Sequence, residues 1–227
     1  MKNIEILHED DFSIVINKPA GLAVQGGKGI KTSLDKLLAE IRNPPPLLVH
    51  RLDMDTSGVL LAAKSREVAA SFSHFFSYRK VVNMYIAVCK SCPQKTEGVI
   101  TEDINVHGSL KKSETRYKVL KSSNSLQIDN ENIVKQIDCD YSILEIELGT
   151  GRMHQIRKHL AAIGNPVLGD DKYGDFTLNK SLKKNAGLKH LLLHASRLII
   201  KDKYNLDISA PLPKYFKPYD IINNNFN

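Results

Sequence analysis

Long apolar runs are absent from the 227 residues of this chain. No segment approaches the roughly 20 apolar residues that a membrane-spanning helix needs, and no apolar signal segment follows Met1. With 42% hydrophobic and 25% charged residues, the composition is that of a soluble globular protein. We therefore expect a cytoplasmic protein with one domain over residues 1–227, which is long enough to form two lobes.

Cysteine is also scarce. The chain has 3 cysteines, and this small odd number argues against a disulfide framework. Cys89 and Cys92 have the C-x-x-C spacing of many zinc sites, but no second cysteine pair or histidine pair is well placed to complete one. We interpret the cysteines as reduced thiols and expect no metal site.

Acidic residues are in short supply only in the last third. Residues 1–150 contain 19 Lys and Arg against 19 Asp and Glu, whereas residues 151–227 contain 13 against 6. The last third therefore carries the whole net charge of +7. A basic segment beside a neutral one suits a polyanionic partner such as nucleic acid, although a solvated basic surface would have the same composition.

The most informative stretch that is present is H-R-L-D-M-D-T-S-G, residues 50–58. Apolar residues 47–49 precede it and 59–63 follow it, so the pattern predicts two buried strands joined by a polar loop. Turn geometry explains residues 55–58. It does not explain Asp53, a carboxylate that we expect to be buried among the neighbouring apolar residues.

Periodicity predicts most of the remaining elements. The expected strands are 13–17, 85–88 with Tyr85 at its start, 113–120, 141–148, 191–200 and 206–210, and the expected helices are 34–41, one capped by Ser65, and 152–163. We interpret residues 124–132 as a loop and Lys180 to Lys189 as a solvated basic run. Pro211 and Pro213 are expected to end the regular structure.

Helix 152–163 carries an arginine in an unusual place. Its buried stripe is predicted to be Met153, Ile156, Leu160 and Ile163, and at 100° per residue Arg157 lies about 40° from Met153, at the edge of that stripe. A half-buried arginine needs an anion. That anion could be Asp53, a structural glutamate or an RNA phosphate.

Six spaced blocks together resemble the RluA-type pseudouridine synthases. They are N-K-P-A-G-L at 17–22, R-L-D-x-x-T-S-G at 51–58, Tyr85, G-R-M-H-Q-I-R at 151–157, G-D-x-x-Y-G at 169–174 and L-H-A at 193–195. Their order and spacing run from about residue 10 to 213, nearly the whole chain. Residues 113–119 are most similar to members that act on large-subunit ribosomal RNA, and transfer RNA stays open as the substrate.

The resemblance implies a fold and a reaction. The fold would be α+β, with a central, mostly antiparallel sheet flanked by helices and loops and an active-site cleft across the sheet. The reaction would turn uridine into pseudouridine in RNA by a bond rearrangement, which requires no redox cofactor and no metal. Some members of the family carry an N-terminal S4-type module, but this chain starts almost at the first strand of the catalytic domain, so we expect no such module, and we expect a monomer.

The resemblance also implies roles for individual residues. Asp53 would be the catalytic carboxylate, Tyr85 would stack on the uracil, and Arg157 would pair with Asp53 and keep it ionised. Ile156 would form an apolar wall, and Arg51 would fill the gap that the target base leaves in the RNA or hold the displaced strand. Further substrate contacts are expected from His50, Thr56, Arg152 and Gln155.

Two rival interpretations and one departure accompany this prediction. Asp53 and Asp55 could instead hold a metal ion in a nuclease or nucleotidyl transferase, which activity in EDTA would exclude. The chain could also be an RNA-binding module without catalysis, although the complete set of Asp53, Tyr85 and Arg157 speaks against this. Relatives usually have a lysine where Asn83 stands, so one basic contact is in doubt.

Overall fold

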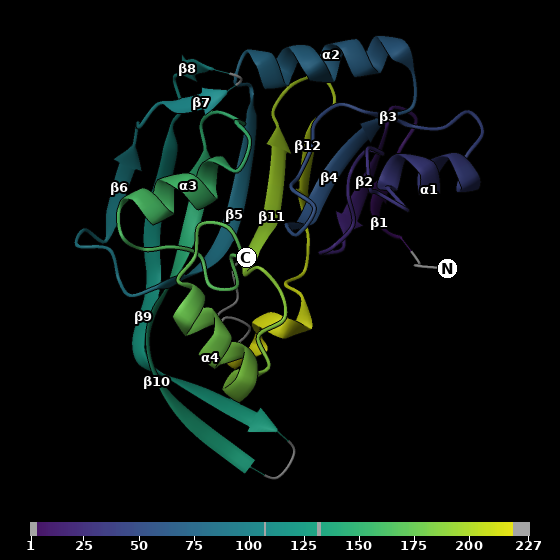
Figure 1. Cartoon of the computed structure of the whole chain (residues 1–227). Coiled ribbons are helices and arrows are strands. Elements are labelled where there is room, and N and C mark those ends of the chain that lie inside the picture. The colour runs from purple at the N-terminus through teal and green to yellow at the C-terminus, as the bar shows by residue number, and fades with distance from the viewer. Residues whose placement is uncertain (1–3, 107, 131–132, 220–227) are drawn as a thin grey trace. The chain divides into compact units, whose positions relative to one another are not determined.

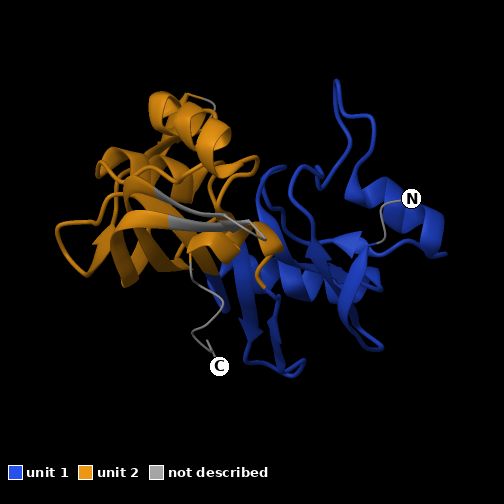
Figure 2. Cartoon of the chain, turned by 90° about the horizontal axis from the view of Figure 1, so that it is seen from below, with its two compact units in different colours: residues 1–84, 194–211 blue, residues 85–193, 212–227 orange. Residues whose placement is uncertain are grey.

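The computed structural model describes residues 4–106, 108–130 and 133–219. Figure 2 shows that the chain divides into two compact units, one made of residues 1–84 and 194–211 and the other of residues 85–193 and 212–227. None of the helices in the described part is long and apolar enough to cross a membrane. We describe each unit by itself.

The first unit is built on a sheet with the strand order β1-β2-β4-β11 (Figure 1). These strands are β1 (Glu5–Glu9), β2 (Ser13–Lys18), β4 (Ser57–Ala63) and β11 (Leu193–Ile200), while β3 (Leu47–Leu48) pairs with β4 and β12 (Leu206–Ser209) with β11. Neighbours run antiparallel except for β4 and β11, which are parallel. All seven residues of β4 are buried, which explains its continuous apolar sequence.

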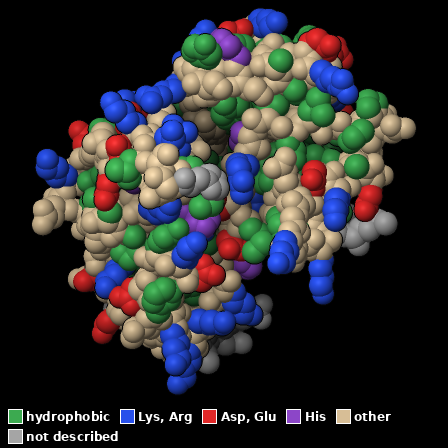
Figure 3. Space-filling model, turned by 45° about the horizontal axis from the view of Figure 1, so that its top comes forward, with side chains coloured by type: hydrophobic (Ala, Val, Ile, Leu, Met, Phe, Trp, Pro, Cys, Tyr) green, Lys and Arg blue, Asp and Glu red, His purple; other side chains and the backbone are tan. Residues whose placement is uncertain are grey.

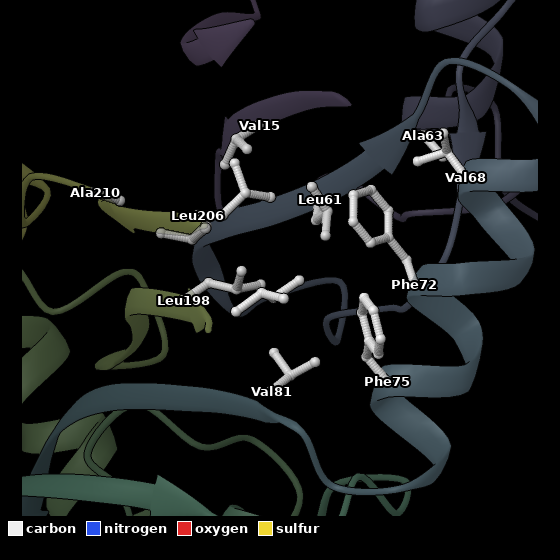
Figure 4. Close-up of a cluster of buried hydrophobic side chains, with 12 residues drawn as sticks. Val15, Leu61, Ala63, Val68, Phe72, Phe75, Val81, Leu198, Leu206 and Ala210 are labelled. Carbon is white, nitrogen blue, oxygen red and sulfur yellow. The ribbon is translucent and has the colours of Figure 1, made fainter. Parts of the chain in front are cut away.

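Helices α1 (Leu34–Ile41) and α2 (Arg66–Ser77) complete this unit. The side chain of Ser65 accepts a hydrogen bond from the backbone N–H of Val68, so it caps α2 as predicted. Figure 4 shows Phe72 and Phe75 of α2 pointing toward Leu61 of β4. Burying side chains of this size stabilises the unit by about 1.5–3 kcal/mol each, so α2 fixes the sheet that presents the loop before β4.

The second unit has the strand order β5-β10-β9-β6. These strands are β5 (Val81–Lys90, of which residues 85–90 belong to this unit), β10 (Ile133–Leu148), β9 (Thr115–Asn130) and β6 (Glu97–Ile100), and a small ribbon joins β7 (Ile104–Val106) to β8 (Ser109–Lys111). The predicted loop at 124–132 is wrong for its described residues, because β9 and β10 form one long antiparallel hairpin. Tyr85 lies in the middle of β5 and not at its start.

Two helices and a 3-10 helix complete the second unit: α3 (Gln155–Ala162), α4 (Phe176–Ala186) and η1 (Lys214–Tyr219). Helix α3 starts later than predicted, because His154 takes a left-handed conformation with φ of 56°. Its buried face consists of Gln155, Ile156, Arg157, His159 and Leu160, whereas Met153 and Ile163 are exposed. Helix α4 occupies the run interpreted as solvated surface, and η1 follows the prolines expected to end regular structure.

Candidate active site

The loop between β3 and β4 is the polar loop that the sequence predicts. Leu47 pairs with Ala63 and Leu48 with Ala62, so the chain leaves the sheet after β3 and returns at β4. Within the loop, the carbonyl of Asp53 accepts a hydrogen bond of 3.2 Å from the N–H of Thr56. Asp53 itself is half-buried, which corrects the expectation of a buried carboxylate. It therefore combines a fixed backbone with access to solvent.

Lys18 is hydrogen-bonded to this loop. It ends β2, and its side chain is fully buried. Its ammonium group donates hydrogen bonds to the carbonyls of Pro19, Leu22 and Met54, at 3.0, 2.8 and 2.9 Å. The carbonyl of Met54 also accepts from the N–H of Gly21. The N-K-P-A-G-L segment, residues 17–22, thus holds the residue next to Asp53.

The other end of the loop is joined to β11. Ser57 Oγ lies 2.9 Å from His194 Nδ1, and His194 Nε2 lies 3.3 Å from the carbonyl oxygen of Ala210. A carbonyl can only accept, so Nε2 carries the proton, and Nδ1 accepts from the Ser57 hydroxyl. Burial lowers the pKa of His194 to about 4 against the opposing effect of the Ala210 carbonyl, so the ring is neutral at pH 7.

Gly58 makes this junction sterically possible. Its φ is +113°, and a Cβ at this position would lie 2.1 Å from the carbonyl oxygen of Ala195. Residues 57 and 58 pair in parallel register with His194 and Ala195. The T-S-G and L-H-A blocks of the sequence are therefore two sides of one contact beside the Asp53 loop.

Arg51 lines a cavity of about 240 Å³ on the same loop. The other lining residues are Ala23, Val24, Gln25, Gly26, Ile30, Leu52 and Met54. Arg51 is exposed. Arg51, Leu52 and Met54 come from the loop that holds Asp53, and the other lining residues come from residues 23–30 of the first unit.

In the second unit, Arg157 forms a buried ion pair that the sequence did not predict. Its Nε donates to Asp170 Oδ2 and its Nη2 to Asp170 Oδ1, both at 2.7 Å. The two side chains are 5% and 0% exposed. Burial acts to raise the pKa of Asp170, but the hydrogen bonds from Arg157 and from the backbone of Tyr173 and Lys172 outweigh it, so the pKa is lowered. The pair is ionised at neutral pH.

Tyr173 completes this arrangement. The guanidinium carbon of Arg157 lies 5.3 Å from the centroid of the Tyr173 ring, close enough for a cation–π contact. The Tyr173 hydroxyl lies 3.0 Å from His154 Nδ1. The G-R-M-H-Q-I-R and G-D-x-x-Y-G blocks thus meet through Arg157, Asp170, Tyr173 and His154.

Comparisons with known proteins identify the family. The family profile described as RNA pseudouridylate synthase matches residues 12–162, more than half of the chain. This chain belongs to the RNA pseudouridylate synthase family. The assignment confirms the family and the α+β fold that the spaced motifs predict.

Individual proteins that are similar to this chain carry the names of pseudouridine synthases. "Ribosomal large subunit pseudouridine synthase C" of Rickettsia felis is 36% identical over 217 residues, which is 93% of this chain and 68% of the relative. The protein of the same name from Buchnera aphidicola subsp. Schizaphis graminum is 34% identical, over 94% of this chain and 69% of the relative. The solved structure of human RNA pseudouridylate synthase domain containing 4 has a TM-score of 0.75 at 28% identity and covers 93% and 90% of the two chains.

The predicted site residues of this pseudouridylate synthase family member divide between its units. Asp53, Arg51, His50 and Thr56 lie in the first unit, and Tyr85, Arg152, Gln155, Ile156 and Arg157 lie in the second. Tyr85, Ile156 and Arg157 are 7%, 5% and 4% exposed. The predicted pairing of Asp53 with Arg157 stays a prediction.

The remaining predicted substrate contacts have protein partners. His50 Nε2 accepts from the N–H of Leu61, and its ring stacks on Phe76 at 4.5 Å. Gln155 is 2% exposed, and its amide group bonds to the Glu114 carbonyl, Thr115, Thr150 and the N–H of Arg152. Thr56 is likewise buried, whereas Arg152 is exposed. The predicted RNA contacts of these four residues stay predictions.

Proposed function

We propose that this chain isomerises uridine to pseudouridine in large-subunit ribosomal RNA. Its membership of the RNA pseudouridylate synthase family carries the proposal. The relatives from Rickettsia felis and Buchnera aphidicola, both named for the large ribosomal subunit, support this RNA as the substrate. The basic last third of the chain is suited to the phosphates of such a substrate.

Asp53 is the catalytic residue in this proposal. The N1–C1′ bond of the uridine breaks, C5 of the uracil bonds to C1′, C5 loses its proton and N1 gains one, so atoms and electrons balance within the nucleotide. Breaking the glycosidic bond develops positive charge on the ribose, which a carboxylate can stabilise, attack or deprotonate. The bonds from Lys18 and Gly21 to the Met54 carbonyl support this role, because a fixed backbone holds Asp53 in place.

Tyr85 and Arg157 assist in the proposal. The ring of Tyr85 stacks on the uracil, and the guanidinium of Arg157 favours the ionised form of Asp53. The bidentate bond to Asp170 supports the role of Arg157, because it fixes the plane of the guanidinium at two of its five donors. Ile156 supplies an apolar wall next to Arg157.

In the proposal, Arg51 binds the RNA next to the target uridine. The target uridine must leave its base stack before Asp53 can reach it, and a side chain that fills the vacated space makes this easier. The exposure of Arg51 and its place two residues before Asp53 support this role. The adjoining cavity of about 240 Å³ offers room for part of a displaced nucleotide.

The test replaces one carboxylate and keeps its neighbour. We expect Asp53→Asn to bind large-subunit ribosomal RNA with unchanged affinity and to form no pseudouridine in it, because the amide cannot supply the negative charge. Asp55→Asn is the matched control, since Asp55 is a half-buried residue of the same loop, and we expect it to keep most of the activity. Pseudouridine mapping of total RNA with and without each protein measures both.

Three results would contradict the proposal. Pseudouridine formation by Asp53→Asn at the wild-type rate would remove Asp53 from the chemistry. Loss of activity in EDTA together with equal defects in Asp53→Asn and Asp55→Asn would favour the metal-dependent rival. New pseudouridines in transfer RNA and none in ribosomal RNA would change the substrate.

A further inference from the structure

We propose a second RNA-binding site in this chain, a cavity beside α4 that takes one nucleotide of single-stranded RNA, with its phosphate on lysines and its base on an exposed phenylalanine. The site rests on the proposed function, because RNA is its ligand. The cavity measures about 320 Å³ and lies entirely within the second unit. Its lining residues are Gly169, Asp171, Phe176, Asn179, Lys180, Lys183, Leu188, Lys189 and His190.

The shape of the cavity follows from α4. Phe176, Lys180 and Lys183 stand at positions i, i+4 and i+7 of this helix and therefore share one face. Gly187 ends the helix in a left-handed conformation, and the chain then turns so that Lys189 and His190 face the same cavity. A cavity of about 320 Å³ is at the lower end of the roughly 300–1,000 Å³ range of ligand pockets, which fits one nucleotide.

The charge of the cavity selects an anion. In the described part of the chain, Lys180, Lys183 and Lys189 form no ion pair with a carboxylate. The two nearby acids have partners of their own: Asp171 Oδ1 lies 3.4 Å from Arg157 Nη2, and Asp175 Oδ2 lies 2.7 Å from Lys90 Nζ. The lining thus holds three lysines against one carboxylate, Asp171, and this excess of positive charge favours a phosphate.

The aromatic side chains favour a nucleotide over a bare phosphate. Phe176 lines the cavity although its side chain is 62% exposed, an unusual position for a phenylalanine. His190 is exposed too, and its ring stacks on Tyr215 at 4.5 Å. Exposed rings beside lysines are the combination with which proteins bind single-stranded nucleic acid, because every base has a face that can stack.

The position of the cavity in the second unit adds to the argument from its lining. Figure 3 shows Lys and Arg side chains spread over the visible face with Asp and Glu among them, so charge alone marks no single binding patch there. The cavity also adjoins the active-site residues of the second unit, because Gly169 and Asp171 flank Asp170, the partner of Arg157. A nucleotide held there would anchor the RNA through the same loop that fixes Arg157.

Lys184 provides a matched control for the test. It is an exposed lysine of α4 next to Lys183, but it does not line the cavity. We expect Lys180→Ala, Lys183→Ala and Lys189→Ala each to raise the Kd for a fluorescent single-stranded oligouridine and for ribosomal RNA about five-fold, and to lower the slope of log K against log salt by about 0.7. Lys184→Ala should leave the Kd within two-fold of wild type (about 0.4 kcal/mol) and the salt slope unchanged.

A second variant tests the base contact. Phe176→Ala should weaken oligouridine binding about five-fold or more without changing the salt slope, because stacking carries no charge. Equal effects of Lys183→Ala and Lys184→Ala, or an unchanged Kd in Phe176→Ala, would overturn the site. The site would also be overturned if free uridine 5′-monophosphate bound tightly but displaced neither the oligouridine nor the ribosomal RNA.

The wild-type protein separates this proposal from the proposed function. If wild type forms pseudouridine in ribosomal RNA while the lysine variants bind like Lys184→Ala, only the second site is wrong. If wild type forms no pseudouridine but the cavity variants still lose oligouridine affinity, the proposed function fails and the site stands. Thermal denaturation of each variant confirms that it is folded.

Discussion

At the scale of single residues, the Arg157–Asp170 pair explains why two distant sequence blocks occur together. Both side chains are almost fully buried, and two bonds of 2.7 Å join them. Losing one partner of such a buried pair leaves an uncompensated charge in the interior, and this costs more free energy than the intact pair contributes to stability. Each block therefore requires the other, whatever Arg157 does for the reaction.

Removing Arg157 should reduce stability and activity together. We expect Arg157→Met to lower the free energy of unfolding by about 3–5 kcal/mol, because Asp170 is left as a buried and uncompensated charge. Urea denaturation measures the loss, and pseudouridine formation measures the activity. The double variant Arg157→Met, Asp170→Asn removes that charge, so it should recover part of the stability and none of the activity.

Arg197 offers the matched comparison. It also binds an aspartate through two bonds, to Asp207 at 2.6 and 2.7 Å, but both side chains are nearly half exposed. Arg197→Met should cost less than about 1 kcal/mol, since solvent screens such pairs. If Arg157→Met and Arg197→Met lost equal stability, burial of the Arg157 pair would not be the cause.

The sequence identified Arg157 but not its partner. The angle of 100° per residue places Arg157 beside the apolar stripe, and from this an anion follows. Which anion it meets depends on how residues 168–175 fold back, and periodicity holds no information on that. Lys18 is similar, because the sequence shows it only as part of the N-K-P-A-G-L block, whereas its three carbonyl partners appear only in three dimensions.

At the scale of elements, the parallel contact of β4 with β11 is the most constrained feature near the Asp53 loop. Residues 57 and 58 of β4 lie beside His194 and Ala195 of β11. The Ser57–His194 hydrogen bond ties the strands together where the loop re-enters the sheet. Small changes in this contact should therefore reach Asp53 through the backbone.

Gly58 is the position at which this contact can be tested. Gly58→Ala should destabilise the protein by about 3 kcal/mol or more, because the new Cβ would meet the Ala195 carbonyl at 2.1 Å and φ is +113°. Gly151→Ala is the control, since a Cβ there meets no atom within 4 Å. Thermal denaturation of both variants decides the matter, and a Gly58→Ala protein as stable as Gly151→Ala would contradict the close contact.

Strongly patterned elements were predictable, and weakly patterned ones were not. The strands at the Asp53 loop, helix α2 and the β11–β12 hairpin follow from apolar runs, a serine cap and alternation. Residues 124–130 have only two apolar members, Leu126 and Ile128, and were interpreted as a loop, yet pairing with β10 makes them a strand. Helix α4 was missed because its lysines indicate only solvation, and its single fully buried leucine, Leu182, gives little periodic signal.

At the scale of the whole molecule, the chain builds its first unit from two distant segments. Residues 194–211 return to the unit formed by residues 1–84 and supply β12 and most of β11. Leu198 and Leu206 from this segment join Phe72 and Leu61 in one core cluster, as Figure 4 shows. Folding of this unit therefore depends on contacts between two segments that are more than a hundred residues apart in the sequence. Its stability is sensitive to changes at those contacts.

Two histidines of this unit, the half-buried His50 and the buried His194, couple its stability to pH. Burial lowers the pKa of His50 to about 4, and burial likewise lowers the pKa of His194 to about 4 despite the Ala210 carbonyl. The ordinary pKa of 6.5 applies to both in the unfolded chain. Between pH 6.5 and about 4 the unfolded state therefore binds more protons than the folded state, and stability must fall as pH falls through this window.

We expect each histidine to remove up to about 1.4 kcal/mol of unfolding free energy per pH unit in that window, and nothing above it. Burial also lowers the pKa of His159, which adds to the effect. Urea denaturation at several pH values should give a shallower decline for His50→Gln and for His194→Asn than for wild type. His190→Gln, which removes an exposed histidine, is the control. A decline of equal steepness in all four proteins would mean that His50 and His194 do not set the acid sensitivity of this fold.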